Sequence, residues 1–291
     1  MKHKHFLFLA ITALAVVSLG CKVTLDIPMQ EISAGELQTE TIQIMAPDSE
    51  VVDVDLVFGA GDLTIAPGSD SYLISGQATY NVADFKPVIK FEDNRVTLET
   101  GNLEIGGIPD LKNIDDFKNE WDLLLGSTPM NLTISSGAYK GDLEFGSLLI
   151  RNLEITDGAA DVTLRFSTPN LVAMDSFRYT TGASNVKLFG LGYANFASMI
   201  FRSGAGDYLL DFAGGILRET VVSIESGVSQ VTVDVPVGVN AKVIFKGGLV
   251  TINPTGNWEK SGDQYILQGT GPSLTINVDM GAGTLNLKSS D

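Results

Sequence analysis

A glycine-centred cassette recurs along this chain and limits the folds that it can adopt. Each cassette has two apolar residues five and three positions before the glycine, and two more four and six positions after it. Ala or Val follows each of the glycines, which are Gly59, Gly137, Gly158, Gly182, Gly204, Gly227 and Gly281. The one exception at an apolar position is Gly141. From Gly137 to Gly227 the cassettes are 21 to 24 residues apart, which indicates a repeat array.

The spacing within a cassette predicts two short strands that meet at a bend. Apolar residues two apart lie on one face of a strand. The two apolar pairs are an odd number of residues apart, so a straight strand would send them to opposite faces. The chain must therefore bend or bulge between them, and glycine, which lacks Cβ and tolerates positive φ, suits that position.

The repeat predicts an all-β chain with a stacked β-solenoid of about 22 residues per coil. We expect the regular coils to run from Gly137 to about Val235. A weaker coil, carrying Gly248, follows 21 residues after Gly227, and Gly281 would close the array 33 residues later. The alternative is an antiparallel meander or sandwich, whose turns also come about every ten residues.

One segment departs from strand periodicity. Its apolar residues recur at intervals of three and four, and they are Ile108, Leu111, Ile114, Phe117 and Trp121. Pro109 and Asp110 provide a helix start. We therefore expect a short helix over residues 109–121 that caps the first coil or joins two parts of the chain, with a partner-binding helix as the alternative.

Residues 1–21 have the pattern of an export signal. Lys2 and Lys4 precede a mostly apolar stretch that ends at Gly20-Cys21, and this stretch is too short to span a membrane comfortably. We expect cleavage before Cys21 and attachment of lipid to it, as in a bacterial lipoprotein held on the extracytoplasmic side of a membrane. An ordinary cleaved signal or an anchor helix is the alternative. Residues 22–40 would form a tether.

Charge and composition exclude several functions. The formal net charge of −16 becomes −18 once residues 1–21, with two Lys and no acid, are removed. An acidic surface repels nucleic acid. His3 and His5 are the only histidines and Cys21 is the only cysteine, which excludes His-dependent nucleophilic catalysis and the usual His/Cys zinc sites in the mature chain. We expect no enzyme activity, cofactor or metal.

Carboxylates are the remaining catalytic candidates, because glycoside hydrolysis uses two of them. The candidate pairs are Asp53/Asp55, Asp115/Asp116, Asp207/Asp211 and Glu219/Glu225. Asp62, Asp161 and Asp207 all lie three residues after a cassette glycine, and this repetition favours a structural role, an Asx-type turn bond. The Gly-Ala-Gly-Asp sequences ending at Asp62 and Asp207 are only weakly similar to calcium-binding repeats.

The aromatic residues offer one candidate contact. Trp258 lies among turn-forming residues, so it could stack on a sugar or meet a partner. The interpretation that we favour is a Trp folded over the nearest sheet edge. Tyr179, Phe201 and Tyr208 occupy inward cassette positions and are expected in the core.

The chain resembles the toast-rack family in two parts. Val54 to Glu99, with Phe58 to Leu63 and Ser75 to Val82, is similar to the family's N-terminal domain, for which we expect residues 41–120. Residues 121–291 resemble its C-terminal β-solenoid, which Lia-type membrane regulators of envelope stress share. The matching stretches there are Ile155 to Phe166, Ser203 to Asp207 with Leu210 to Phe212, and Val231 to Pro236. The resemblance implies a non-enzymatic module of the cell envelope.

Three functions remain open at this stage. The first is a lipid-anchored binding or scaffold module with a protein partner, which contributes to envelope-stress sensing. The second is a protein that binds or processes envelope polysaccharide, and the third is an adhesin-like structural protein. The sequence names no small-molecule ligand.

Overall fold

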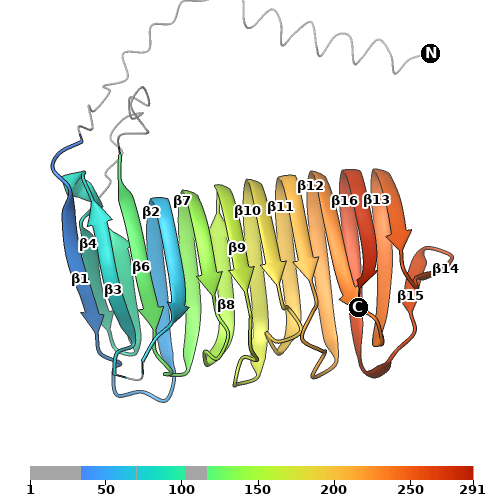
Figure 1. The fold of residues 1–291 in the computed structure, drawn as a ribbon, viewed down its shortest axis with the longest axis horizontal. Helices are drawn as coiled ribbons and strands as arrows, with labels where there is room; N and C mark the ends of the chain where they lie inside the picture. The colour runs from blue at the N-terminus through green and yellow to red at the C-terminus, as the bar shows by residue number, and fades with distance from the viewer. Residues whose placement is uncertain (1–33, 70, 102–116, 291) are drawn as a thin grey trace, which may run out of the picture. The chain divides into compact units, whose positions relative to one another are not determined.

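The computed structural model describes residues 34–69, 71–101 and 117–290, and nearly all of this part of the chain is β-structure (Figure 1). The first strands are β1 (Gln38–Ile44), β2 (Val52–Pro67), β3 (Ile74–Tyr80), β4 (Pro87–Glu92), β5 (Arg95–Thr100) and β6 (Asn119–Leu125). The regular rungs are β7 (Met130–Glu144), β8 (Ile150–Asp157), β9 (Ala159–Arg165), β10 (Met174–Phe189), β11 (Phe196–Asp211) and β12 (Thr220–Pro236). The last strands are β13 (Val239–Thr255), β14 (Glu259–Ser261), β15 (Gln264–Leu267) and β16 (Thr270–Ser290). The one helical turn among the described residues is η1 (Ala83–Phe85).

Long strands bend at their cassette glycines, so that the sheet has two limbs. We call the part before the corners limb 1 and the part after them limb 2. In limb 1 the first half of β2 lies between β5 and β7, whereas in limb 2 its second half lies between β6 and β7. From β7 to β13 each rung pairs in parallel with its neighbours across both limbs. This is the stacked β-solenoid that the repeat predicts.

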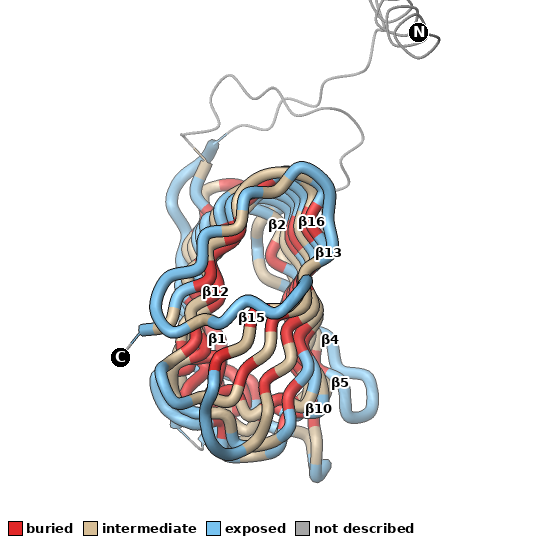
Figure 2. The backbone as a smooth tube through the Cα atoms, turned by 90° about the vertical axis from the view of Figure 1, so that its right-hand side faces the viewer, coloured by how far each residue is buried: buried red, intermediate tan, exposed pale blue. Residues whose placement is uncertain are grey.

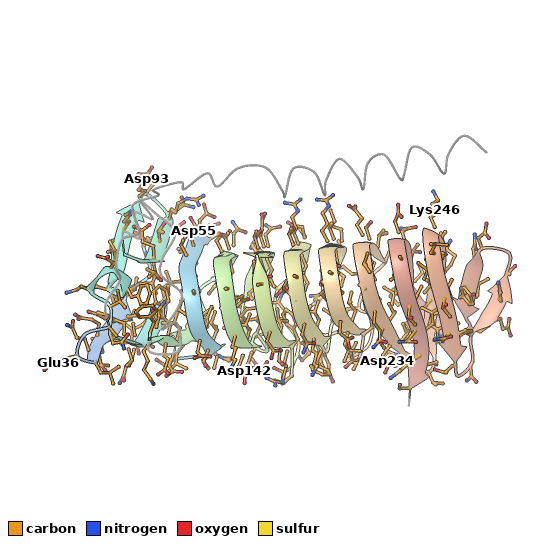
Figure 3. The ribbon with its side chains drawn as sticks, turned by 90° about the horizontal axis from the view of Figure 1, so that it is seen from above. Glu36, Asp55, Asp93, Asp142, Asp234 and Lys246 are labelled. Carbon is orange, nitrogen blue, oxygen red and sulfur yellow. The ribbon has the colours of Figure 1, made fainter. Side chains whose placement is uncertain are left out.

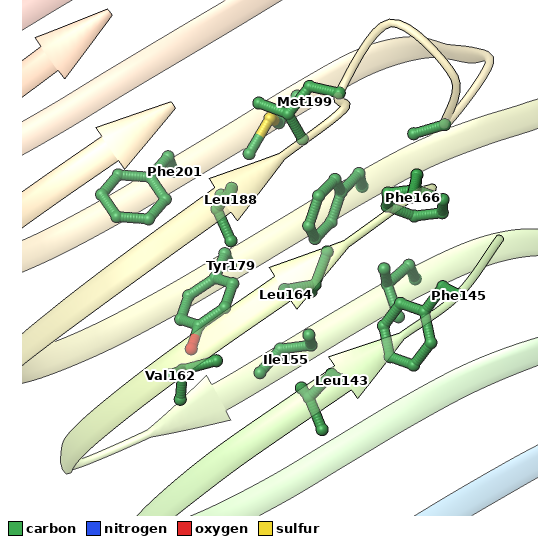
Figure 4. Close-up of a cluster of buried hydrophobic side chains, with 14 of the residues drawn as sticks. Leu143, Phe145, Ile155, Val162, Leu164, Phe166, Tyr179, Leu188, Met199 and Phe201 are labelled. Carbon is green, nitrogen blue, oxygen red and sulfur yellow. The ribbon is translucent and has the colours of Figure 1, made fainter. Parts of the chain in front are cut away.

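The predicted inward positions form the core between the limbs. Every apolar residue of the seven predicted cassettes is at most 2% exposed. Figure 4 shows part of this core, with Leu143, Val162 and Leu164 from limb 2 facing Ile155 and Tyr179 from limb 1. Gly141, the exception, leaves room for the ring of Tyr139, which would touch a Cβ at position 141.

The corner glycines stand in a single file along the stack. A Cβ on Gly182 would come within 2.3 Å of the Gly158 carbonyl oxygen, and one on Gly204 within 2.6 Å of that of Gly182. The close approach of successive peptide groups therefore explains these glycines. Positive φ does not explain them, because only Gly59 of the cassette glycines has it, at 62°.

The order of the rungs differs from the sequence order at both ends. The file starts at Gly59, which Gly137 follows, so the cassette in β2 belongs to the same stack. Strand β16 lies between β12 and β13. Our expectation that Gly281 closes the array is wrong: the Gly281 corner follows that of Gly227, and Gly248 stacks on Gly281 as the last corner. Strand β16 follows the cassette pattern more regularly than β13 does, and it lies inside the stack, where it pairs in parallel with β12 and β13.

The expected helix over residues 109–121 is not found where the structure describes it. Residues 109–116 lie outside the described part, residues 117 and 118 have no regular structure, and residues 119–121 belong to β6. Trp121 is 1% exposed and packs edge-to-face on Phe58 at 5.1 Å. Alternate residues of β6 are buried, and strand pairing with β2 and β3 on both sides accounts for the difference from a helix.

The predicted segment boundaries at residues 40 and 120 stay predictions. Strand β1 begins at Gln38 and β6 spans residue 120, and the sheet is continuous from β6 through β2 to β7. In the described part of the chain no helix is long and apolar enough to cross a membrane.

Candidate functional site

The outer face of limb 1 carries a shallow hollow of about 190 Å³ over β2, β5, β7, β8 and β10. Its polar side chains are the outward members of strands whose other face is buried, and its lining also includes the inward residues Leu132 and Leu153. The hollow is lined by Asp53, Asp55, Arg95, Asn131, Leu132, Thr133, Asn152, Leu153, Glu154, Ser176 and Arg178. Figure 3 places Asp55 on this side of the stack and Asp142 and Asp234 on the opposite side.

A row of hydrogen bonds crosses the floor of this hollow from rung to rung. Asn131 Nδ2 donates to Asp53 Oδ1 at 2.8 Å, and Asn152 Nδ2 donates to Asn131 Oδ1 at 2.9 Å. Ser176 Oγ donates to Asn152 Oδ1 at 2.8 Å. Parallel rungs put equivalent positions about 4.8 Å apart, so each Asn amide can reach the next rung and still hold one N–H toward the solvent.

Ion pairs flank this row. Arg95 lies 2.5 Å from Asp55 and 3.4 Å from Asp53, and its hydrogen bond to Asp55 raises the pKa of the guanidinium. Arg178 lies 3.5 Å from Glu154. The hollow therefore presents paired charges and amides, which suit a polar ligand with donors and acceptors on one edge.

A second hollow of about 270 Å³ lies on the same face near the end of the stack. It is lined by Ser223, Glu225, Ile244, Lys246, Asn277, Val278 and Asp279. Glu225 accepts a hydrogen bond from Arg202 Nε at 2.9 Å. Both hollows are on limb 1, so this face is the candidate contact surface.

The sequence-predicted acid pairs lie in different environments. Asp53 and Asp55 line the first hollow but share Arg95. Glu219 accepts hydrogen bonds from Ser273, which lower its pKa, whereas Glu225 binds Arg202. Asp115 and Asp116 lie outside the described residues, as does the predicted lipid site Cys21.

The third described pair lies on the outer face of limb 2. Asp207 accepts a hydrogen bond from Gln230 at 3.2 Å, and Asp211 lies beside Asp234 in the next rung. Burial raises the pKa of Asp211, with Asp234 as a smaller cause in the same direction.

The corner aspartates bridge rungs. Asp161 accepts from Asn185 at 3.2 Å, in the same way as Asp207 accepts from Gln230. In the described part of the chain, these contacts to the next rung, and not Asx-type turn bonds, are the hydrogen bonds found at Asp161 and Asp207. Among the described residues no three His, Cys, Asp or Glu side chains are grouped as a metal site.

A buried polar cluster at one corner was missed by the sequence reasoning. Asp157 is 6% exposed and accepts hydrogen bonds from Tyr179 Oη at 2.8 Å and from Thr181 Oγ1. Burial is the largest cause of its raised pKa. The signal was present, because Asp157 follows the inward residues Leu153 and Ile155 by the same step of two.

Asn170, which the sequence reasoning also missed, holds a return loop in place. It is 2% exposed, accepts a hydrogen bond from Ile150 N at 3.0 Å and donates one to Ile150 O at 2.8 Å. Trp258 is partly buried against the core. This agrees with the interpretation that we favoured, a Trp folded over the sheet edge, and not with an exposed stacking platform.

These features define a class of protein: a bent, parallel β-solenoid with a polar outer face and an enclosed apolar interior. The family model described as the N-terminal domain of toast_rack, DUF2154, matches residues 33–188. The chain therefore belongs to the toast-rack family, as the sequence motifs implied.

Solved structures also resemble this chain. A suspected cell adhesion protein from Clostridium sporogenes is 21% identical, with a TM-score of 0.46, over 87% of this chain and 100% of its own. A suspected adhesin from Bacteroides fragilis is 13% identical, with a TM-score of 0.47, over 87% and 97%. A suspected lipid-binding protein from Parabacteroides distasonis is 12% identical, with a TM-score of 0.39, over 89% and 99%. None of the curated proteins matches. These likenesses do not indicate what this chain binds.

Proposed function

We propose that this chain is a non-catalytic, lipid-anchored binding module of the bacterial cell envelope, and that the outer face of limb 1 makes the contact. The observation that carries the proposal is the placement of both hollows on this one face. Rigid strands hold its polar side chains in fixed rows, and such pre-organisation favours binding.

On this face of limb 1, we base the absence of catalysis on the pairing of its acids with arginines. Asp53 and Asp55 share one guanidinium, and Glu225 is bound by another. A general acid for glycoside hydrolysis needs a raised pKa and a partner carboxylate placed across the scissile bond. The paired acids of this face offer a scaffold of charges instead.

The contact face is tested by two matched sets of substitutions. The first replaces Asn131, Asn152 and Arg178 on limb 1 with Ala, and the second replaces Asn185, Lys187 and Asn286 on limb 2 with Ala. Each set removes two amides and one cation from the outer side of the stack. We expect the limb 1 set alone to change an envelope-stress reporter in cells, and equal output from both sets would contradict the proposal.

The lipid anchor is tested separately. Fatty-acid labelling of the full chain in cells should label the wild type and lose the label in Cys21→Ser, which should also leave the membrane fraction. Labelling that persists in Cys21→Ser would contradict the anchor and leave the contact face to its own test.

Glycan binding is the second candidate, and the row from Asp53 to Ser176 favours it, because amides and hydroxyls spaced by the rungs match a hydroxyl-rich chain. The residues lining the hollow include no aromatic ring. A glycan array and a hydrolysis screen on the chain from residue 22 distinguish the readings. Binding without cleavage supports glycan recognition, whereas reducing ends whose release is lost in Asp53→Asn/Asp55→Asn would show an enzyme.

A further inference from the structure

The last rung is incompletely covered on limb 2. In β12 the inward residues Val231 and Val233 are fully buried, whereas Ile252, at the same cassette position as Val231, is half-buried in β13. Leu249, next to the corner glycine, is 86% exposed, and its inner-rung counterpart Val228 is 67% exposed, so this position faces outward in both rungs. Figure 2 shows the end of the stack from this side, with the second half of β13 largely exposed. Terminal repeats of a solenoid ordinarily cover the end of the core with a polar face.

The main chain of this rung is open as well. On limb 1, β13 is covered by β15 over Ala241–Ile244. On limb 2, residues 247–255 pair with β16 on one side, and no other described strand pairs with them. No charged residue occurs in this stretch, and its one proline, Pro254, lies near its end. Exposed edges without charges are templates for another strand.

The opposite end of limb 2 presents a second open edge that fits the first. Strand β1 pairs with β3 only, among the described strands. Two antiparallel steps, β1 to β3 and β3 to β6, and one parallel step to β2 make β1 run in the same direction as the rungs of limb 2. A parallel rung could therefore be followed by β1 of another copy without reversing direction.

Three lysines without an acidic partner lie at the β13 end. Lys242 and Lys246 lie on β13 and Lys260 on β14, beside the acids Glu259 and Asp263. None of these three lysines forms an ion pair with another described residue. Residues 239–269 therefore carry three lysines against two acids, an excess of one positive charge in a chain with a formal net charge of −16.

The β1 end is acidic. Glu36, Glu92 and Asp93 lie there, and Figure 3 places Glu36 and Asp93 at the end of the stack opposite Lys246. Two of the lysines at this end are already paired, Lys86 with Glu40 and Lys90 with Glu99. Ends of opposite charge attract and ends of like charge repel. This favours head-to-tail contact, between the β13 end of one copy and the β1 end of the next, over contact between two like ends.

We propose that copies of this chain associate head to tail, with residues 248–255 of one copy pairing in parallel with β1 of the next. The contact continues limb 2 across the junction and covers Ile252. Such a heterologous contact leaves a free end on each added copy, so it produces open assemblies of increasing length. This proposal is independent of the ligand of limb 1.

The experiment is sedimentation velocity on the chain from residue 22 over a range of concentrations. We expect the wild type to form a series of species above the monomer, which shrinks as salt is raised. The double variant Leu249→Lys/Ile252→Lys should lose these species, since it would bury one charge, at position 252, in the junction and place a second on the pairing edge strand. The control Leu209→Lys/Val228→Lys adds the same two charges on the outside of inner rungs and should assemble like the wild type.

Mixing distinguishes the two geometries. The double variant at β13 keeps its β1 edge, so in excess it should terminate fluorescent wild-type assemblies and shorten them. Circular dichroism and a melting temperature equal to that of the control establish that the variant is folded. A wild type that stays monomeric up to its solubility limit overturns the proposal. A discrete dimer that the double variant forms as readily as the wild type also overturns it, because such a dimer does not use the β13 edge.

Discussion

The inner rungs and the last rung of the stack share one sequence pattern and differ in burial. Phe201 in β11 and Phe245 in β13 both lie three residues before a corner glycine. Phe201 is fully buried, with rings of Tyr179 and Tyr208 within 5.7 and 5.3 Å, whereas Phe245 is half-buried. The cassette therefore fixes which way a side chain points, and neighbours on both sides decide whether it is enclosed.

The same contrast explains how stability is distributed. A rung between two others shares its apolar surface and its main-chain bonds with both, and a terminal rung with one. The free energy that a residue contributes should thus depend on its place in the stack as much as on its type. Matched substitutions at equivalent cassette positions can test this dependence.

The largest effect is expected from Phe201→Ala. Loss of a fully buried ring with a residual cavity costs about 3–5 kcal/mol of unfolding free energy. Phe245→Ala at the equivalent position should cost less than half of that, because its ring is partly solvated and the rung can relax. Urea unfolding of both variants measures the difference, and equal losses would contradict the dependence on position.

A similar comparison applies to the corners. Gly182→Ala brings a Cβ within 2.3 Å of the Gly158 oxygen, and Gly204 stacks on Gly182 from the other side. We expect a loss of roughly 2–3 kcal/mol. Gly248→Ala meets the Gly281 oxygen at 2.4 Å, but no described rung follows it, so it can shift outward. Its melting temperature should fall by less than that of Gly182→Ala, and the reverse order would count against the single file.

The buried Asp157 should make the interior sensitive to pH. Its pKa is raised in the folded chain, so its proton is held more tightly there than in the unfolded chain. The stability that this gives is present at low pH and is lost as pH rises from about 4 through the raised pKa. Asp157→Asn removes this loss, so its melting temperature relative to the wild type should increase with pH. Asp161→Asn, at an exposed position of the next strand, is the control and should show no such trend.

The smallest effect is expected on the outer face of limb 1. Arg202 and Glu225 join inner rungs at 2.9 Å, with nearly half of each side chain exposed. Exposed ion pairs contribute little to stability. Arg202→Ala should therefore unfold at the wild-type temperature within error, and a clear fall would show that this face stabilises the stack.

The sequence was sufficient for the bent strands and their core. Alternation around Gly182 or Gly204 specifies the inward residues. A strand has a period of two, and the bend at the glycine shifts the alternation so that both apolar pairs face inward. The first hollow was not predictable as a whole. Asp53 and Asp55 were candidates, but Asn131, Asn152 and Arg178 come from rungs that meet them only through stacking.

The order of the rungs was the other feature that could not be predicted from the sequence. Gly248 precedes Gly281 in the sequence, and nothing local states that β16 inserts between β12 and β13. Parallel pairing depends on the partner strand, and partner choice is a long-range property. The helix predicted from the spacing of Ile108 to Trp121 was wrong at its described end for a related reason. There, the pairing of β6 with two strands outweighed the local periodicity.

Hydrogen exchange followed by mass spectrometry tests the central contrast most directly. The measurement compares amides of residues 248–255 in β13 with those of residues 227–235 in β12, at a dilution where the chain sediments as a monomer. The account predicts much faster exchange in β13, because its outer edge has no strand partner among the described residues. Equal protection of the two segments in the monomer would contradict it.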